Sequence, residues 1–220
     1  MPGAVGAVIA APSSGSGKTT ITLGLLRYFA RNNVPVSSFK IGPDYIDPGF
    51  HTAAGGRPCL NIDLWAMRPE TVASLFGQAS AYSELVIGEG VMGLFDGAQS
   101  SDQGRSGSTA DTAGVLGLPV ILVVDASAQA QSAAATIHGF ATFRDDVTVS
   151  GVIFNRVGSA RHAAILKDAA APLGIPVLGC VPRSPEIAVP DRHLGLVQAS
   201  EMTALETFLD AAADLVAAHI

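Results

Sequence analysis

The stretch that decides the fold is VGAVIAAPSSGSGKTT, residues 5–20. It begins with a continuous apolar run, Val5–Ala10, which predicts a buried strand. Small residues follow, and the segment Lys18–Arg31 then repeats apolar residues such as Ile21 and Leu25 one helical turn apart. A strand, a loop of small residues and a helix in this order predict a loop whose backbone amides point at a bound anion.

This loop matches the P-loop pattern G-x-x-x-x-G-K-[ST], except that Pro12 replaces its first glycine. Proline holds a turn but not a positive φ, so we expect a slightly different entry to the loop. Lys18 would place its charge on the β- and γ-phosphates of ATP, and the Thr19 hydroxyl would bind Mg²⁺. The alternative is a glycine-rich turn with a surface lysine, which the strand and helix on either side disfavour. The predicted nucleotide contacts in this loop are Ser13, Ser14, Gly15, Ser16, Gly17, Lys18, Thr19 and Thr20.

Outward from this loop, short apolar runs alternate with longer helical patterns along the chain. This alternation predicts an α/β fold with a doubly wound, mainly parallel sheet flanked by helices, whose ligands bind at the carboxyl ends of the strands. The further predicted strands are Val36–Phe39, Leu85–Gly88, Pro119–Val124, Val149–Phe154 and Pro176–Val181. The further predicted helices are Pro69–Ala79, Ser127–Phe143, Ala160–Leu173 and Ser200–Ala218. The segments Ile41–Met67 and Glu89–Thr109 are interpreted as long functional loops.

The composition excludes several classes of protein. With 220 residues, 48% hydrophobic and 15% charged, the chain can bury one large core and is not expected to be disordered. A net charge of −6 without a basic stripe disfavours nucleic-acid binding. No apolar run approaches the ~20 residues that a membrane span needs. Cys59 and Cys180 are too far apart for a zinc motif, and the five histidines, which lack ligand spacing, are interpreted as surface or packing residues.

A second polar cluster is KIGPDYIDPGFH, residues 40–51. Lys40 ends a predicted strand that lies beside the P-loop in sheets of this kind. Asp44 and Asp47 are two carboxylates in a turn restricted by proline, and Mg²⁺ on nucleotide phosphates usually takes one or two protein carboxylates. The alternative is that Asp47 caps a short helix beginning at Pro48.

Two further acidic residues follow apolar strands. Glu89 begins the glycine-rich stretch EGVMGLFDG, residues 89–97, where the backbone can approach a ligand closely. Asp125 ends a run that resembles a Walker B strand, and it competes with Glu89 for the metal. We favour Glu89 and interpret Asp125 as a cap of the helix after it.

The segment RSGSTAD, residues 105–111, precedes another helix. Ser108 and Asp111 form a capping box for that helix. The same helix N-terminus would also suit a substrate carboxylate, with Arg105, Ser108 and Thr109 as the contacts.

Polar residues also follow the last two predicted strands. Asn155 and Arg156 come after one of them, and an asparagine amide can pair with an adenine edge. Pro182 follows the last strand. We expect all three residues at the nucleotide.

Together these stretches resemble the N-terminal synthetase domain of the cobyrinic acid a,c-diamide synthase family, including its hydrogenobyrinic acid form. Residues 40–51 and 89–97 distinguish this family from other P-loop families, because a P-loop alone fits many of them. The stretch GVIFNRVGS, residues 151–159, adds to the match. The resemblance implies a dethiobiotin synthetase-like P-loop fold. It also implies a ligase that phosphorylates the a- and c-acetate carboxylates of a corrinoid with ATP and lets ammonia displace the phosphate.

The resemblance also implies roles for the polar residues. Lys18 and Lys40 would neutralise the repulsion between a carboxylate and the γ-phosphate. The residues expected to hold Mg²⁺ are Thr19, Asp47 and Glu89. The residues expected to serve the corrin carboxylate are Asp44, Tyr45 and Asp96.

The family also carries a C-terminal class I glutamine amidotransferase domain. Neither Cys59 nor Cys180 lies in a G-x-C-x-G nucleophile elbow. We therefore expect residues 1–220 to form one ATP-binding amide-synthetase domain of a cytoplasmic enzyme, supplied with ammonia by a glutaminase domain. We expect no nucleic-acid or membrane partner and leave a homodimer open.

Two alternative functions remain. One is a dethiobiotin synthetase-like ligase, which the chain length favours and the motifs do not. The other is a ParA/MinD-like regulatory ATPase, but such proteins usually have a second lysine early in the P-loop, and residues 11–16 contain none.

Overall fold

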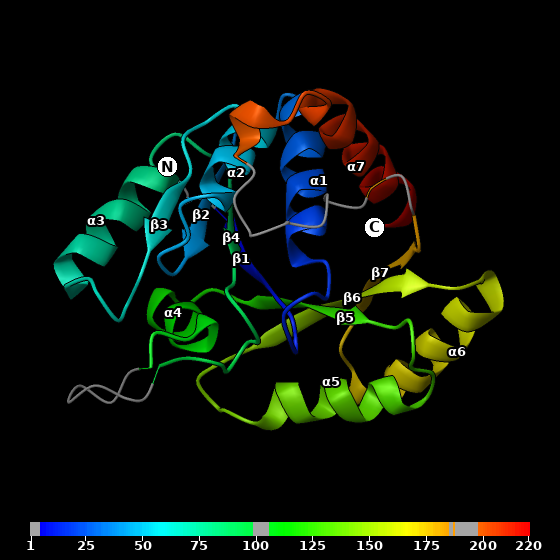
Figure 1. Ribbon diagram of the computed structural model, residues 1–220. Helices are drawn as coiled ribbons and strands as arrows, with labels where there is room; N and C mark the ends of the chain where they lie inside the picture. The colour runs from blue at the N-terminus through cyan, green and yellow to red at the C-terminus, as the bar shows by residue number, and fades with distance from the viewer. Residues whose placement is uncertain (1–4, 99–105, 185–186, 188–197) are drawn as a thin grey trace.

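A single parallel sheet forms the centre of the molecule (Figure 1). The computed structural model describes residues 5–98, 106–184, 187 and 198–220. Seven strands pair in the order β3-β2-β4-β1-β5-β6-β7, and every pair is parallel. The strands are β1 (Val5–Ala10), β2 (Val36–Ile41), β3 (Leu60–Ile62), β4 (Leu85–Glu89), β5 (Val120–Asp125), β6 (Val149–Val157) and β7 (Val177–Pro182).

Helices cover both faces of this sheet, so the predicted doubly wound α/β fold is confirmed. Val8 and Ala10 of β1 pack toward one face, whereas Ile9 packs toward the other, as the alternation along a strand requires. Figure 1 shows α1 and α7 on one side of the sheet and α5 and α6 on the other. The helices are α1 (Lys18–Arg31), α2 (Asp47–Gly55), α3 (Pro69–Ser80), α4 (Thr109–Leu116), α5 (Ser132–Thr142), α6 (Ala160–Ala170) and α7 (Leu205–His219).

The strand order places a crevice at the centre of the sheet. Strand β1 lies between β4 and β5: the chain runs from β1 out to β2 and β3, returns to β4 beside β1, and then continues through β5, β6 and β7 on the other side. Ligands of open α/β sheets bind at such a switch point, outside the carboxyl ends of the strands. The P-loop follows β1 directly, and Lys40 of β2 pairs in register with Glu89 of β4 at the same edge.

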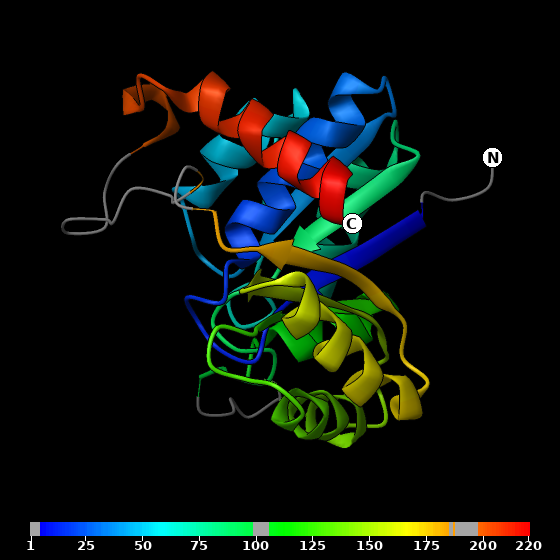
Figure 2. The ribbon, with the colours of Figure 1, turned by 90° about the vertical axis from the view of Figure 1, so that its right-hand side faces the viewer.

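The last helix covers the first one (Figure 2). Helix α7 packs so closely on α1 that a Cβ on Gly24 would lie 2.6 Å from the Ala212 carbonyl oxygen. Arg27 of α1 also donates to Asp210 at 2.8 Å and to Glu206 at 2.6 Å. The two helices therefore form one packed layer above the sheet.

The interpretation of residues 41–67 as one long loop is wrong in part, because the segment contains helix α2 and strand β3. Three prolines and several glycines concealed both elements in the sequence. The helix begins at Asp47, and its first amides are capped by Asp44, whose Oδ1 accepts from the Ile46 and Asp47 amides at 2.8 and 3.1 Å. The capping carboxylate is thus Asp44 and not Asp47.

Two helices begin later than predicted. Helix α5 starts at Ser132 and not at Ser127, because Asp125 accepts from the Ser127 amide and holds the chain in a turn. Asp125 therefore caps a turn and not the helix. Helix α7 starts at Leu205, after a short 3₁₀ turn at Ala199–Glu201.

In the part of the chain that the structure describes, no helix combines the length and the apolar character needed to cross a membrane.

Candidate active site at the switch point

A cavity of about 870 Å³ opens at the carboxyl ends of the strands. Its volume is typical of small-molecule sites, which range over about 300–1,000 Å³. Its walls come from the P-loop, from the ends of β2, β4, β6 and β7 and from the segments after β5 and β7. It brings together most residues that the sequence predicted at a nucleotide or metal: Ser14, Gly15, Gly17, Lys18, Thr19, Thr20, Lys40, Asp47, Glu89, Asn155, Arg156 and Pro182.

The P-loop has the backbone that phosphate binding requires. Gly15 and Gly17 have φ values of 77° and 90°, in the left-handed region that favours glycine. Lys18, the first residue of α1, donates to the Met92 carbonyl oxygen at 2.6 Å and to that of Ser13 at 3.4 Å. Burial, with the nearby positive charge of Lys40, lowers the pKa of Lys18. The ammonium group therefore lies over the loop, where an anion would offset the cost of its burial.

A buried group of charges lies beside the P-loop. Lys40 donates to Asp47 Oδ2 at 2.7 Å, to Glu89 Oε1 at 3.0 Å and to the Gly90 carbonyl oxygen at 3.4 Å, which uses all three protons of its ammonium group. Burial opposes the charge on Lys40, but Glu89 and Asp47 outweigh burial and raise the pKa of Lys40. Burial likewise opposes the charge on Glu89, yet Lys40 and the hydrogen-bond donors around the carboxylate hold its pKa well below the usual range.

Glu89 contacts the P-loop directly. Thr19 Oγ1 donates to Glu89 Oε1 at 2.6 Å, which joins the hydroxyl expected to bind Mg²⁺ to the carboxylate expected to bind it. Asp125, the competing carboxylate, pairs instead with the Arg156 guanidinium and the Ser127 amide. The geometry favours Glu89 over Asp125 as the acidic group beside the P-loop.

The oxygen donors at this edge fit a magnesium ion that is held largely by nucleotide phosphates. Mg²⁺ keeps several waters and usually takes one or two protein carboxylates. Among the residues that the structure describes, no three His, Cys, Asp or Glu side chains are arranged to hold a metal ion by themselves. Thr19, Asp47 and Glu89 are thus a suitable partial shell, to which phosphate oxygens and water would add.

His51 was missed by the sequence analysis. It lies one helical turn after Asp47 on α2, is fully buried, and places Nε2 2.6 Å from Glu89 Oε2 and Nδ1 3.5 Å from Cys59 Sγ. Burial lowers the pKa of His51, but the hydrogen bonds to Cys59 and Glu89 and the charge of Glu89 raise it to about 9. The spacing D-x-x-x-H on a short helix was the signal that could have identified it.

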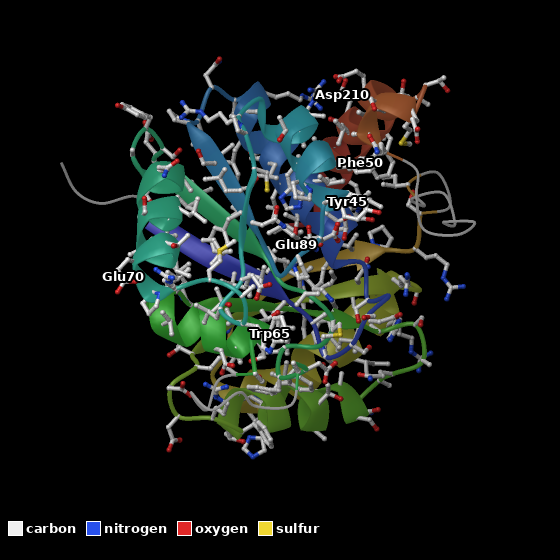
Figure 3. All side chains as sticks on the ribbon, turned by 60° about the vertical axis from the view of Figure 1, so that its left-hand side comes forward. Tyr45, Phe50, Trp65, Glu70, Glu89 and Asp210 are labelled. Carbon is white, nitrogen blue, oxygen red and sulfur yellow. The ribbon has the colours of Figure 1, made fainter. Side chains whose placement is uncertain are left out.

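Of the three residues predicted at the corrin carboxylate, Asp44 belongs to the cavity lining, whereas Tyr45 and Asp96 do not. Asp44 lines the cavity while it caps α2. Tyr45 is 72% exposed and lies on the same side of the molecule as Glu89 (Figure 3). Asp96 folds back on its own loop, where Oδ2 accepts from the Gly93 amide at 2.9 Å. Their role toward a substrate stays a prediction.

The N-terminus of α4 uses its polar groups within the protein. Ser108 Oγ accepts from the Asp111 amide at 3.1 Å, so the predicted cap is confirmed, but the Asp111 carboxylate accepts from Ser106 and does not complete the box. Thr109 Oγ1 bonds to the Val91 amide and carbonyl oxygen. Both hydroxyls are buried and lie outside the cavity lining, so contact with a substrate would require them to exchange partners. Arg105 lies outside the described residues.

Asn155 supports the P-loop from the other side. Its Nδ2 donates to the Ser16 carbonyl oxygen at 2.9 Å, and its Oδ1 accepts from the Arg156 amide at 2.9 Å. A Cβ on Gly17 would lie only 2.1 Å from this Nδ2. One amide proton and one lone pair remain for an adenine edge, so the predicted base contact stays compatible with this geometry.

The fold and this site define a P-loop nucleotide-binding domain. Residues 7–197 match the family described as CobQ/CobB/MinD/ParA nucleotide binding domain. The chain belongs to this family. Its fold also resembles chloroplast FtsY from Physcomitrella patens (TM-score 0.56) and the signal recognition particle receptor FtsY from Elizabethkingia anophelis (TM-score 0.57). Both are 17% identical and match 95% of this chain and 65–66% of theirs, so the likeness concerns the fold alone.

Within the family, the chain is similar to hydrogenobyrinate a,c-diamide synthases. It is 54% identical to that of Brucella ovis over 216 residues, which cover 98% of this chain and 49% of the relative. It is 51% identical to that of Agrobacterium fabrum, over 94% of this chain and 47% of the relative. It is 52% identical to that of Rhodobacter capsulatus, over 99% of this chain and 50% of the relative. The chain thus spans about half the length of these curated relatives.

Proposed function

We propose that residues 1–220 are the ATP-binding synthetase part of an enzyme that amidates the a- and c-acetate carboxylates of hydrogenobyrinic acid. The observation that carries this proposal is a cavity that is lined both by Lys18 and Thr19 of the P-loop and by Lys40, Asp47 and Glu89. The relatives that match nearly the whole chain bear the name of this activity and favour the cobalt-free acid over cobyrinic acid.

In the proposed reaction, a carboxylate oxygen of the substrate attacks the γ-phosphorus of ATP and ADP leaves. Ammonia then attacks the carbonyl carbon of the acyl phosphate, and inorganic phosphate leaves. Lys18 and Lys40 lower the repulsion between the two anions in the first step. Because the charges are held in place by buried hydrogen bonds, little reorganisation is needed as the reaction proceeds.

The remaining groups position the reactants. Mg²⁺, when bound with ATP, would neutralise and orient the phosphates, held on the protein side by Thr19, Asp47 and Glu89. Asn155, Arg156 and Pro182 would hold the base. Asp44, Tyr45 and Asp96 would orient the corrin acetate and the incoming ammonia at the mouth of the cavity. In the full-length enzyme we expect a cytoplasmic glutamine amidotransferase domain to supply the ammonia.

The test combines nucleotide binding with trapping of the acyl phosphate. Calorimetry should show ATP binding that requires Mg²⁺ and is lost in Lys18→Ala. With hydrogenobyrinic acid, ATP-Mg²⁺ and hydroxylamine, the acyl phosphate should be captured as a hydroxamate, and with ammonium it should give mono- and diamide detectable by mass. Tight ATP binding without hydroxamate, amide or ADP in the presence of the corrinoid would contradict the proposed substrate but not the nucleotide site.

A further inference from the structure

A buried histidine, His51, contacts the Glu89 carboxylate but does not line the cavity. His51 lies on α2, its side chain is 0% exposed, and it is not part of the cavity lining. It therefore cannot contact nucleotide or substrate. Any effect of His51 on the proposed reaction, on which this inference rests, must act through Glu89.

The two ring nitrogens of His51 face different partners. Glu89 Oε2 lies 2.6 Å from His51 Nε2, and an ionised carboxylate only accepts, so Nε2 carries the proton. At the back of the ring, Nδ1 faces Cys59 Sγ at 3.5 Å. The imidazole is thus clamped between the thiol and the carboxylate, in one orientation.

The two oxygens of Glu89 are consequently divided between two tasks. Oε1 accepts from Thr19 at 2.6 Å and from Lys40 at 3.0 Å, on the P-loop side. Oε2 accepts from His51 on the opposite side. Rotation of the carboxylate would leave the fully buried Oε2 without its donor, which is costly in a dry interior. The donor on His51 therefore fixes the rotation that presents Oε1 to Thr19.

We infer that His51 is a positioning residue for the metal–nucleotide site: its Nε2–H holds Glu89 so that one carboxylate oxygen faces Thr19 and the incoming Mg²⁺. Partners of this kind behind a metal-binding group typically change metal affinity by about 10–100-fold when removed. Cys59 supports the ring from behind and has the smaller effect, since a thiol is a weak partner.

The chain offers a matched pair of substitutions to test this. In His51→Gln the side-chain amide can reach the place of Nε2 and donate to Glu89. In His51→Asn the same amide is one methylene shorter and can reach only the place of Nδ1. Both variants retain a polar amide on α2, so they differ mainly in the hydrogen bond to Glu89. His162→Gln is the control elsewhere, because His162 is also hydrogen-bonded, to the Gln129 carbonyl oxygen and the Gly158 amide, but belongs to α6.

The measurement is the dissociation constant of ATP by calorimetry with Mg²⁺ and with a chelator, together with the melting temperature of each variant. We expect the Mg²⁺-dependent gain in affinity to fall about 10-fold or more in His51→Asn and to stay within about threefold of wild type in His51→Gln and His162→Gln. A role in stability alone would lower the melting temperature and leave the gain unchanged.

Two results would overturn the inference. The first is that folded His51→Asn shows the same Mg²⁺-dependent gain in ATP affinity as the wild type. The second is that folded His51→Gln and His51→Asn lose this gain to the same extent. If His51→Asn does not fold, His51→Gln decides alone, since the inference requires that its gain be retained. A wild-type protein that shows no Mg²⁺-dependent ATP binding would instead contradict the proposed function, so the two failures are distinguishable.

Discussion

The two sides of the P-loop are built differently. On the β2–β4 side, formed by Lys40, Asp47, His51 and Glu89, the charged side chains are at most 4% exposed and bond to one another. On the β5–β6 side, formed by Asp125, Asn155 and Arg156, the Asp125–Arg156 ion pair has side chains that are 29% and 41% exposed. Each side comprises the ends of the two strands that flank β1 in one direction, β4 and β2 or β5 and β6, so sheet position alone does not distinguish them.

Burial is what separates the two sides energetically. Removing one member of a buried charge pair leaves the other uncompensated, at a cost of about 3–5 kcal/mol. An exposed pair contributes about 0–1 kcal/mol. The β2–β4 side is therefore a fixed array of charge suited to chemistry on phosphates, whereas the β5–β6 side supports the P-loop through the hydrogen bond from Asn155 to Ser16.

The largest expected effect comes from neutralising the acid on each side. Glu89→Gln should lower kcat/KM for ATP at least about 100-fold, because it removes the charge that faces Thr19 and leaves Lys40 and His51 undercompensated. Asp125→Asn should lower it less than about tenfold, since it disturbs a partly exposed pair. Steady-state kinetics at saturating corrinoid would measure both.

Equal losses in these two variants would contradict the distinction between the sides. Circular dichroism should first establish that Glu89→Gln is folded. The Mg²⁺ dependence of ATP binding then provides the second comparison, and it should change in Glu89→Gln only.

The second prediction concerns the β5–β6 side. Gly17→Ala should weaken ATP binding about 10-fold or more. The added Cβ would lie 2.1 Å from Asn155 Nδ2, and the alanine would also have to adopt a positive φ. Position 15 has a similar φ, but no atom lies within 4 Å of a Cβ added there. Gly15→Ala should therefore lower the free energy of unfolding only by the backbone strain, about 1–2 kcal/mol.

A double substitution sharpens this test. Adding Asn155→Ala to Gly17→Ala removes the clash and should recover part of the stability lost in Gly17→Ala, as measured by urea unfolding. Strictly additive losses would mean that Asn155 does not restrain the loop.

The third prediction is a pH dependence confined to the β2–β4 side. The pKa of His51 is raised to about 9 from 6.5, so its contribution to stability is complete below about pH 6.5 and is lost as the pH rises through 9. The free energy of unfolding of the wild type should fall relative to His51→Gln over this range, by at most about 3 kcal/mol. Asp125, whose pKa lies below its usual value, adds no such slope.

Urea unfolding of both proteins between pH 6 and 9.5 would measure this difference. Parallel curves would mean that His51 is not protonated in the folded chain.

The bounds of β1 and α1 could be predicted from the local sequence. The predicted bounds of Val5–Ala10 and Lys18–Arg31 are those observed, because an apolar run, a glycine loop and helical periodicity all lie within one short segment. The polar residues at strand ends were also identifiable, since parallel strands present their carboxyl ends at one edge.

The partners within the site were not predictable in this way. That Lys40 pairs in register with Glu89 depends on β2 lying next to β4, which is a property of the whole sheet. The position of His51 depends on helix α2, whose proline and glycines resemble a loop. Short elements stabilised by distant contacts leave a weak local pattern, and the buried network was hidden for that reason.

The packing of α7 on α1 has a consequence for how the chain is made. The helix that follows the P-loop ends at Arg31, but the helix that covers it extends to His219. At the usual rate of about 5–20 residues per second, roughly 10–40 s separate the synthesis of these two segments on the ribosome. During that time the side of α1 that packs on α7 at Gly24 stays uncovered, so we expect the nascent chain to complete the packing of this layer only after α7 has been made.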